Sequence, residues 1–218
     1  MSLPESSLPP ALREAIGQDF GAVRPLRSPW VRSAVVALPV FAAVATVAVV
    51  THSSLSLGGP GFSAFEWAVA LGLTALALRE AVPGRSVGAQ RVAAALAFGA
   101  IGYLALVALL WRSAGAGWSG PQAVLEALGC GSVVGRLSAL PLAIAIWLVL
   151  RAVPVRPGRS GALAGAAAGL YADSIWHLIC HRSDLVHLSL GHGGAVVVMT
   201  AVGALAGYLL RRGRQQGV

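Results

Sequence analysis

The chain contains no lysine, and its 218 residues carry only eight acidic side chains against sixteen arginines. Charged residues make up 11% of the sequence, where a soluble domain has about 25%. The mean hydropathy is +0.75. This composition excludes an ordinary soluble globular domain. The net charge of +8 comes from short arginine clusters beside hydrophobic stretches, an arrangement that reports membrane topology more than nucleic-acid binding.

Cysteine and catalytic motifs are also scarce. Cys130 and Cys180 are the two cysteines, so a disulfide framework is excluded, although one bridge is allowed if both face an oxidising compartment. The sequence has no nucleophile-elbow serine, no glycine-rich phosphate loop and no H-E-x-x-H helix. These absences argue against nucleophilic catalysis and phosphate-loop chemistry.

Six hydrophobic stretches are each long enough to cross a hydrocarbon core, which needs about 20 apolar residues in a helix. We therefore predict an all-α, polytopic membrane protein with a polar N-terminal arm over residues 1–32, a six-helix transmembrane domain over 33–210 and a basic tail over 211–218. The predicted spans cover residues 33–51, 64–81, 92–111, 132–150, 161–179 and 192–210.

The arginines alternate from one connection to the next. The arm, the second and fourth connections and the tail collect thirteen arginines, and the other three connections carry three. By the positive-inside rule we expect both termini to be cytoplasmic.

The arm carries a stripe of apolar side chains at a spacing of four residues, which predicts a short amphipathic helix. Two interpretations stay open: the helix lies on the membrane surface, or it docks into a groove of a soluble partner. In the docking interpretation the binding residues are Leu8, Leu12, Ile16, Phe20, Arg24 and Arg27.

The fifth span repeats Gly161, Gly165, Gly169, Asp173 and His177 every four residues. Small residues at this spacing form a face against which a neighbouring helix packs closely. An ionisable residue in a hydrophobic span is a candidate functional residue. The simpler alternative is that Asp173 hydrogen-bonds a neighbouring helix or His177.

The remaining reactive side chains gather on the outer face of the predicted topology. Imidazole and thiolate favour Zn²⁺ or copper, and Asp173 could orient His177. The spacing matches no established metal motif, so a hydrogen-bonded polar cap over the helix ends is the competing interpretation. The candidate sensor or metal residues are Cys130, Asp173, His177, Cys180, His181, His187 and His192. Glu66, three residues after Ser63, matches a capping box and is predicted to cap the second span.

Three segments carry a resemblance to a known family: LPPALREAIGQDFGAVRPLRSPW in the arm, IWLVLRAVPVRPGRSGALAG after Cys130, and HLICHRSDLVHLSLGHGG. Together they resemble the NrsF-like family of integral-membrane anti-sigma factors, which includes the CarR type of myxobacteria. That family usually has Cys-Pro in the last loop, whereas His181 follows Cys180 here.

The resemblance implies six helices, no enzyme activity and a cytoplasmic face that holds an extracytoplasmic-function sigma factor inactive at the membrane. We expect an envelope or oxidative signal, such as one generated by light, to release the factor, and we expect no direct binding of nucleic acid. Two other classes are weighed against it: a metal- or haem-binding membrane oxidoreductase built on the outer histidines, and a small transporter. The spans lack the paired broken helices and the charged pathway expected of a transporter.

Overall fold

The computed structural model describes residues 9–11, 14, 27–51, 59–83, 88–114, 120–152, 154–180, 182 and 184–216. Over these residues the chain is helical and has no strand, which confirms the all-α fold class. The helices are α2 (Pro29–Thr51), α3 (Gly59–Glu80), α4 (Ala89–Ala114), α5 (Gly120–Leu137), α6 (Ala139–Leu150), α7 (Pro157–His177), the π-helix η2 (His187–Gly193) and α8 (Gly194–Gln216).

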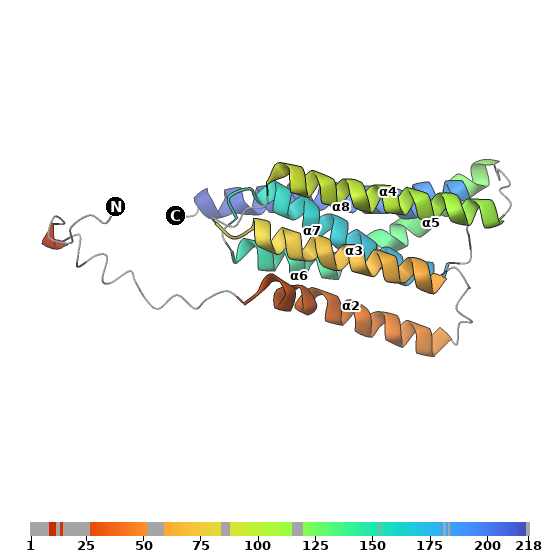
Figure 1. Ribbon diagram of the computed structural model, residues 1–218, viewed down its shortest axis with the longest axis horizontal. Coiled ribbons are helices and arrows are strands. Elements are labelled where there is room, and N and C mark those ends of the chain that lie inside the picture. Colours follow the sequence, from red (N-terminus) through yellow and green to blue (C-terminus); the bar gives the residue numbers. More distant parts are fainter. Residues whose placement is uncertain are drawn as a thin grey trace.

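The helices form an elongated bundle in which successive segments run in opposite directions (Figure 1). The start of α2 and the end of α8 consequently lie at the same end of the bundle. We call this the arginine end, because the helix termini there carry Arg32, Arg79, Arg151, Arg159 and Arg211. The opposite end, where α7 stops and η2 begins, is called the histidine end.

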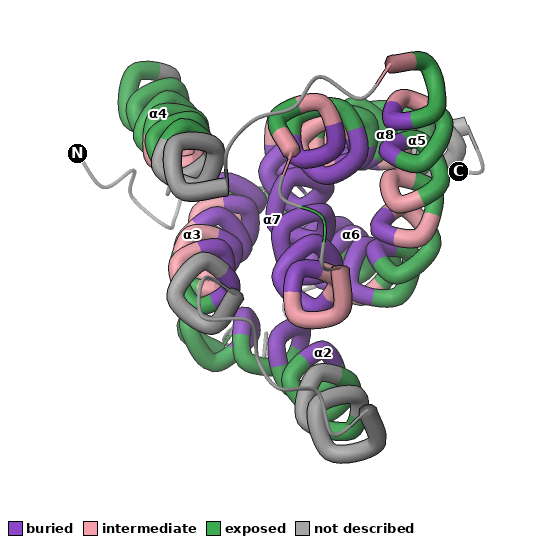
Figure 2. The backbone as a smooth tube through the Cα atoms, turned by 90° about the vertical axis from the view of Figure 1, so that its right-hand side faces the viewer, coloured by how far each residue is buried: buried purple, intermediate pink, exposed green. Residues whose placement is uncertain are grey.

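Helix α7 is the centre of the bundle, and Figure 2 shows it surrounded by α3, α5, α6 and α8. Its residues are buried almost without interruption from Ser160 to Ile175. Alanine and glycine dominate this sequence, and small side chains let several helices approach one axis. Burial on all sides therefore comes from residue size and not from a single apolar stripe.

Helices α7 and α8 touch along a seam of glycines. A Cβ atom at Gly161 or Gly165 would overlap the carbonyl oxygen of Gly203 or Met199, and one at Gly207 would overlap the carbonyl oxygen of Pro157. The two backbones are thus in direct contact, and the obstacle to any larger residue is main chain, which cannot rotate away.

The predicted fourth span is two helices. The axes of α5 and α6 differ by 42° at Ser138. Pro141 lacks the N–H that would bond the carbonyl of Leu137, so the break falls one turn before the proline. Among the described residues, one continuous helical stretch, His187–Arg212, is long and apolar enough to cross a membrane, and the bent pair is a second stretch if counted as one. The six-span topology stays a prediction.

Several boundaries differ from the sequence-based prediction. Helix α3 begins at Gly59 and not at residue 64, and α5 begins at Gly120 and not at residue 132. Residues 187–193 are helical, whereas most of this stretch was predicted as loop, and α8 continues to Gln216 through most of the predicted tail. The outer faces of α4 and α8 expose large apolar side chains, among them Phe98, Ile101 and Val197. In Figure 2 the peripheral helix α4 is mostly exposed along its length.

Candidate functional site

Four buried ionisable side chains meet at the histidine end, and we call them the carboxylate–histidine cluster: Glu66 of α3, Asp173 and His177 of α7, and His192 of η2. Both carboxylates are fully buried. His192 Nδ1 lies 2.6 Å from Asp173 Oδ1, and His177 Nδ1 lies 3.1 Å from Glu66 Oε2. The two imidazole rings stack with their centroids 4.1 Å apart. Three segments distant in sequence are thereby joined by polar contacts inside an apolar bundle.

The π-helix positions the two histidines of η2. In a π-helix residue i bonds residue i+5, so side chains five positions apart lie on one face. His187 and His192 are five apart, both are buried, and their ring centroids are 5.3 Å apart. On an α-helix this spacing would turn them away from each other. Such π-helical turns are frequent at functional sites.

A second group beside the first contains sulfur, and we call it the thiol cluster: Cys130 of α5, Cys180 and His187. One ligand atom from each lies within 4.8 Å of the others. Cys180 Sγ is 3.2 Å from His187 Nε2, and both cysteines are free thiols, each partly buried. Partial burial raises the pKa of Cys180, but hydrogen bonds with His187 and His192 outweigh this and lower it to about 5. The residue is therefore poised as a thiolate, the reactive form.

Polar residues at the surface cover the thiol cluster. Arg182 forms an ion pair with Glu126 of α5 and lies 3.6 Å from the carboxylate of Asp184. Asp184 Oδ1 in turn accepts a hydrogen bond from the backbone N–H of His187 at 2.9 Å. Cys130, Glu126, Arg182 and His187 also line one shallow pocket. Both thiols are partly exposed, and Cys130 lines this pocket, so a small reagent can reach them from the histidine end. The carboxylate–histidine cluster lies deeper.

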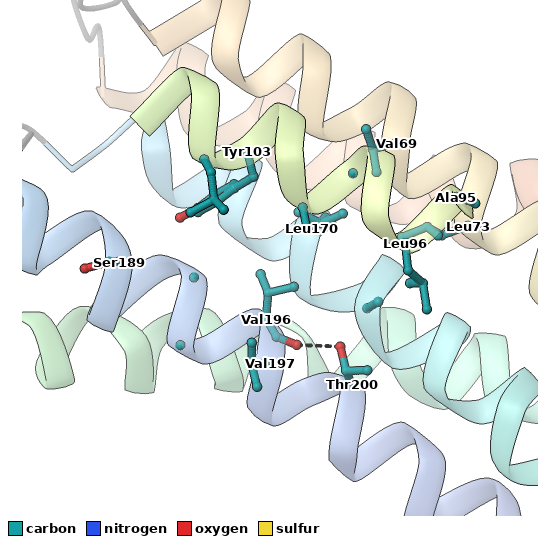
Figure 3. A pocket seen from close by; sticks show the side chains of 16 residues that line it. Val69, Leu73, Ala95, Leu96, Tyr103, Leu170, Ser189, Val196, Val197 and Thr200 are labelled. Atoms are coloured by element: carbon teal, nitrogen blue, oxygen red, sulfur yellow. Dashed lines mark hydrogen bonds between the residues drawn. The ribbon is translucent and has the colours of Figure 1, made fainter. Parts of the chain in front are cut away.

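An apolar cavity lies between α3, α4, α7 and α8 and holds about 580 Å³ (Figure 3). Its polar side chains are already satisfied by main-chain carbonyls. Thr200 donates to Val196, Ser189 to Leu185 and Tyr103 to Leu188, at 2.8, 2.6 and 3.0 Å respectively. The hydroxyl protons of these three side chains are therefore already donated, and the other described residues that line the cavity are apolar or glycine.

At the arginine end, guanidinium groups hold the helix ends together. Arg211 of α8 donates to the carbonyls of Pro154 and Val155 at 2.6 and 2.7 Å. Arg32 of α2 donates to the carbonyl of Leu148 at 2.6 Å. Arg159 of α7 lies 3.5 Å from the buried carboxylate of Glu80. Several of the arginines that predicted the topology thus also have structural roles.

The structure brings together six of the seven candidate sensor residues, in the two clusters above. His181 lies outside the described residues. So do Leu8, Leu12, Ile16, Phe20 and Arg24 of the predicted docking stripe. Arg27 is described and exposed, just before α2.

Glu66 was missed as a site residue, and its predicted role is wrong. Helix α3 begins at Gly59, so Ser63 and Glu66 lie inside the helix and form no capping box. Ser63 Oγ instead donates to the carbonyl of Ser174 at 2.9 Å. The predicted pairing of Asp173 with His177 is also secondary, because Asp173 lies 2.6 Å from His192 and 3.7 Å from His177.

Comparison with known proteins gives one result. The model of the NrsF family, described as negative regulator of sigma F, matches residues 17–212. No curated protein and no solved structure matches the chain. The family match covers both clusters and the helical bundle up to Arg212 in the last turns of α8, so the chain belongs to the NrsF family of negative regulators of sigma F.

Proposed function

We propose that this protein is an anti-sigma factor of the bacterial inner membrane that keeps an extracytoplasmic-function sigma factor inactive at its arginine end. The observation that carries the proposal is the family match over residues 17–212, which gives negative regulation of a sigma factor. The membrane location rests on composition, on the arginine distribution and on the apolar outer faces of α4 and α8.

Both termini are proposed to be cytoplasmic, which puts the N-terminal arm on the side of the transcription machinery. The arm's stripe of Leu8, Leu12, Ile16 and Phe20 is the proposed docking element. Burying such a side chain in a partner groove contributes about 1.5–3 kcal/mol each. Two or three of them would contribute several kcal/mol to the binding of a sigma factor.

The experiment changes Leu12 and Ile16 to Asp and measures a reporter of the sigma factor's target genes, together with the amount of membrane protein. We expect constitutive expression, because each buried charge costs more than the apolar contact it replaces. Gln18→Asp, on the polar face of the same predicted helix, is the matched control and should keep the reporter silent. A silent reporter with the Leu12/Ile16 variant at normal abundance would show that the arm is not the docking element.

We further propose that the thiol cluster receives an oxidative signal. A peroxide would oxidise the Cys180 thiolate to a sulfenic acid with release of hydroxide. The Cys130 thiol would then displace the sulfenic oxygen as water and leave a disulfide. Support comes from the free thiols, their proximity and the lowered pKa of Cys180.

Such a bridge would tie α5 to the connection after α7. Because α7 continues to the arginine end, a shift of α7 could reach the bound factor without the oxidant crossing the membrane. Replacing Cys180 by Ser should leave repression intact and abolish release under oxidative stress. Release with unchanged kinetics in this variant would rule out the thiol cluster as the sensor.

A further inference from the structure

The carboxylate–histidine cluster has more negative charge than its hydrogen bonds account for. Glu66 and Asp173 both have no exposed surface, and the two carboxylates interact electrostatically with each other. Glu66 Oε1 and Asp173 Oδ2 are buried oxygens that no N–H or hydroxyl donor reaches, and the hydrogen bond open to them is with each other, which needs a proton held between the two carboxyl groups. Buried carboxylate oxygens are normally satisfied, because an unpaired one is costly in a medium of low dielectric constant.

Protonation of the histidines is a poor way to balance this charge. If Glu66 and Asp173 are both ionised, protonated histidines balance them only as two imidazolium ions, one on His177 and one on His192; the alternative is a proton that stays between the two carboxyl groups. The two imidazole rings stack face to face with centroids 4.1 Å apart, and two like charges at that distance repel strongly inside a protein. A single divalent cation would balance both carboxylates and leave both imidazoles neutral, the form in which imidazole binds metals.

The ligand atoms converge as a metal site requires. One atom each from Asp173, His177 and His192 lies within 4.8 Å of the others, and Glu66 Oε2 lies 3.1 Å from His177 Nδ1. Metal ligands around one ion are mutually about 3–3.5 Å apart when each bond is about 2.0–2.1 Å in a tetrahedron. Small side-chain adjustments therefore suffice to bring the four atoms into coordination.

We propose that Glu66, Asp173, His177 and His192 bind one Zn²⁺ ion. Four nitrogen and oxygen ligands from three elements, without an open position toward solvent, are typical of a closed, structural zinc site. The ion would join α3, α7 and η2 at the histidine end. This inference does not depend on the sigma factor, and it assigns zinc to the deeper cluster and not to the thiols.

The test uses the full-length protein purified in detergent, with both cysteines present and kept reduced. The protein is loaded with one equivalent of ZnCl₂, dialysed against metal-free buffer and measured by mass spectrometry of its metal content and by X-ray absorption at the zinc edge. We expect about one zinc ion per chain, with nitrogen and oxygen neighbours at about 2.0–2.1 Å and no sulfur at about 2.3 Å. Loss of the metal on dialysis, or a sulfur neighbour, would overturn the proposal.

Variants then assign the ligands. Glu66→Gln and Asp173→Asn should each weaken zinc binding by roughly 10–100-fold or more. Residues that only hydrogen-bond to metal ligands already contribute a factor of about this size. Glu126→Gln removes an exposed carboxylate at the same end and is the matched control, and Cys180→Ser removes a nearby sulfur. Both should keep one equivalent of zinc.

Retention of zinc by Glu66→Gln and Asp173→Asn together, or its loss from Cys180→Ser, would refute the assignment. If a variant does not accumulate, the absorption spectrum of the unaltered protein decides the question, because it distinguishes the carboxylate–histidine cluster from the thiol cluster directly.

Discussion

Replacing Gly165 by Ala is the sharpest test of how the bundle is packed. A Cβ atom there would overlap the carbonyl oxygen of Met199 and lie 3.1 Å from Gly203 Cα. Both obstacles are backbone, so α7 and α8 must separate along the whole glycine seam. Overpacking of this kind costs about 1–3 kcal/mol.

The control is Gly72→Ala in α3, where an added Cβ meets no atom within 4 Å. Alanine favours a helix over glycine by about 1 kcal/mol, so this variant should be as stable as the unaltered protein or more stable. Both variants gain this helix propensity, so the gap in unfolding free energy between them should be the overpacking cost of roughly 1–3 kcal/mol.

Unfolding in mixed micelles by titration with sodium dodecyl sulfate, followed by circular dichroism, measures the difference. Gly203→Ala combined with Gly165→Ala should cost less than the sum of the single changes, because one separation of the helices accommodates both methyl groups. If Gly165→Ala equals Gly72→Ala in stability, the helices are not in backbone contact and the seam is wrong.

Three further predictions concern topology, the thiol and the arginine end. A membrane-impermeant maleimide should label Cys130 and Cys180 in intact cells under reducing conditions. A cysteine introduced by Ser28→Cys into a cysteine-free variant should react only after the cells are opened. The reverse pattern would show that the proposed topology is upside down. The rate of Cys180 alkylation by iodoacetamide should be half-maximal near pH 5, since the pKa of this thiol is lowered to about 5. His187→Asn should move the midpoint toward about 8.5, the value of a free cysteine. A midpoint of about 8.5 in the unaltered protein would contradict the contact with His187. Glu80→Gln should destabilise the protein by about 1–3 kcal/mol, because it removes the carboxylate that faces Arg159. Unchanged stability in the same micelle assay would show that this ion pair does not stabilise the fold.

The helical architecture was predictable because hydrophobic runs of about 20 residues are a strong signal for single helices. The repeat of small or ionisable residues at every fourth position of α7 was equally informative. Local periodicity alone places Gly161, Gly165 and Asp173 near one face of the helix. A bend near the start of α6 follows from Pro141, which lacks a backbone N–H, although the bend falls at Ser138.

The carboxylate–histidine cluster was only partly predictable. Glu66 and His177 are 111 positions apart, and nothing local to either residue indicates their contact. The serine three positions before Glu66 suggested that Glu66 caps a helix. Helix α3 begins earlier, at Gly59, so Glu66 lies inside it and cannot be a cap residue. The pairing of His187 with His192 depends on a π-helix, whose hydrogen-bonding pattern has no periodic signal in a stretch of seven residues.

The π-helix can also be regarded as an α-helix that carries one additional residue. Between His187 and Gly193 the chain makes the longer turn and then returns to α-helical geometry at Gly194, so α8 reaches α7 with Gly203 and Gly207 in phase with the seam. Deleting one residue from the stretch would restore ordinary α-helical turns and turn His187 away from His192. The insertion of one residue is a small change to a gene. Here one additional residue allows a helix that packs in the bundle also to present two imidazoles to the same buried site.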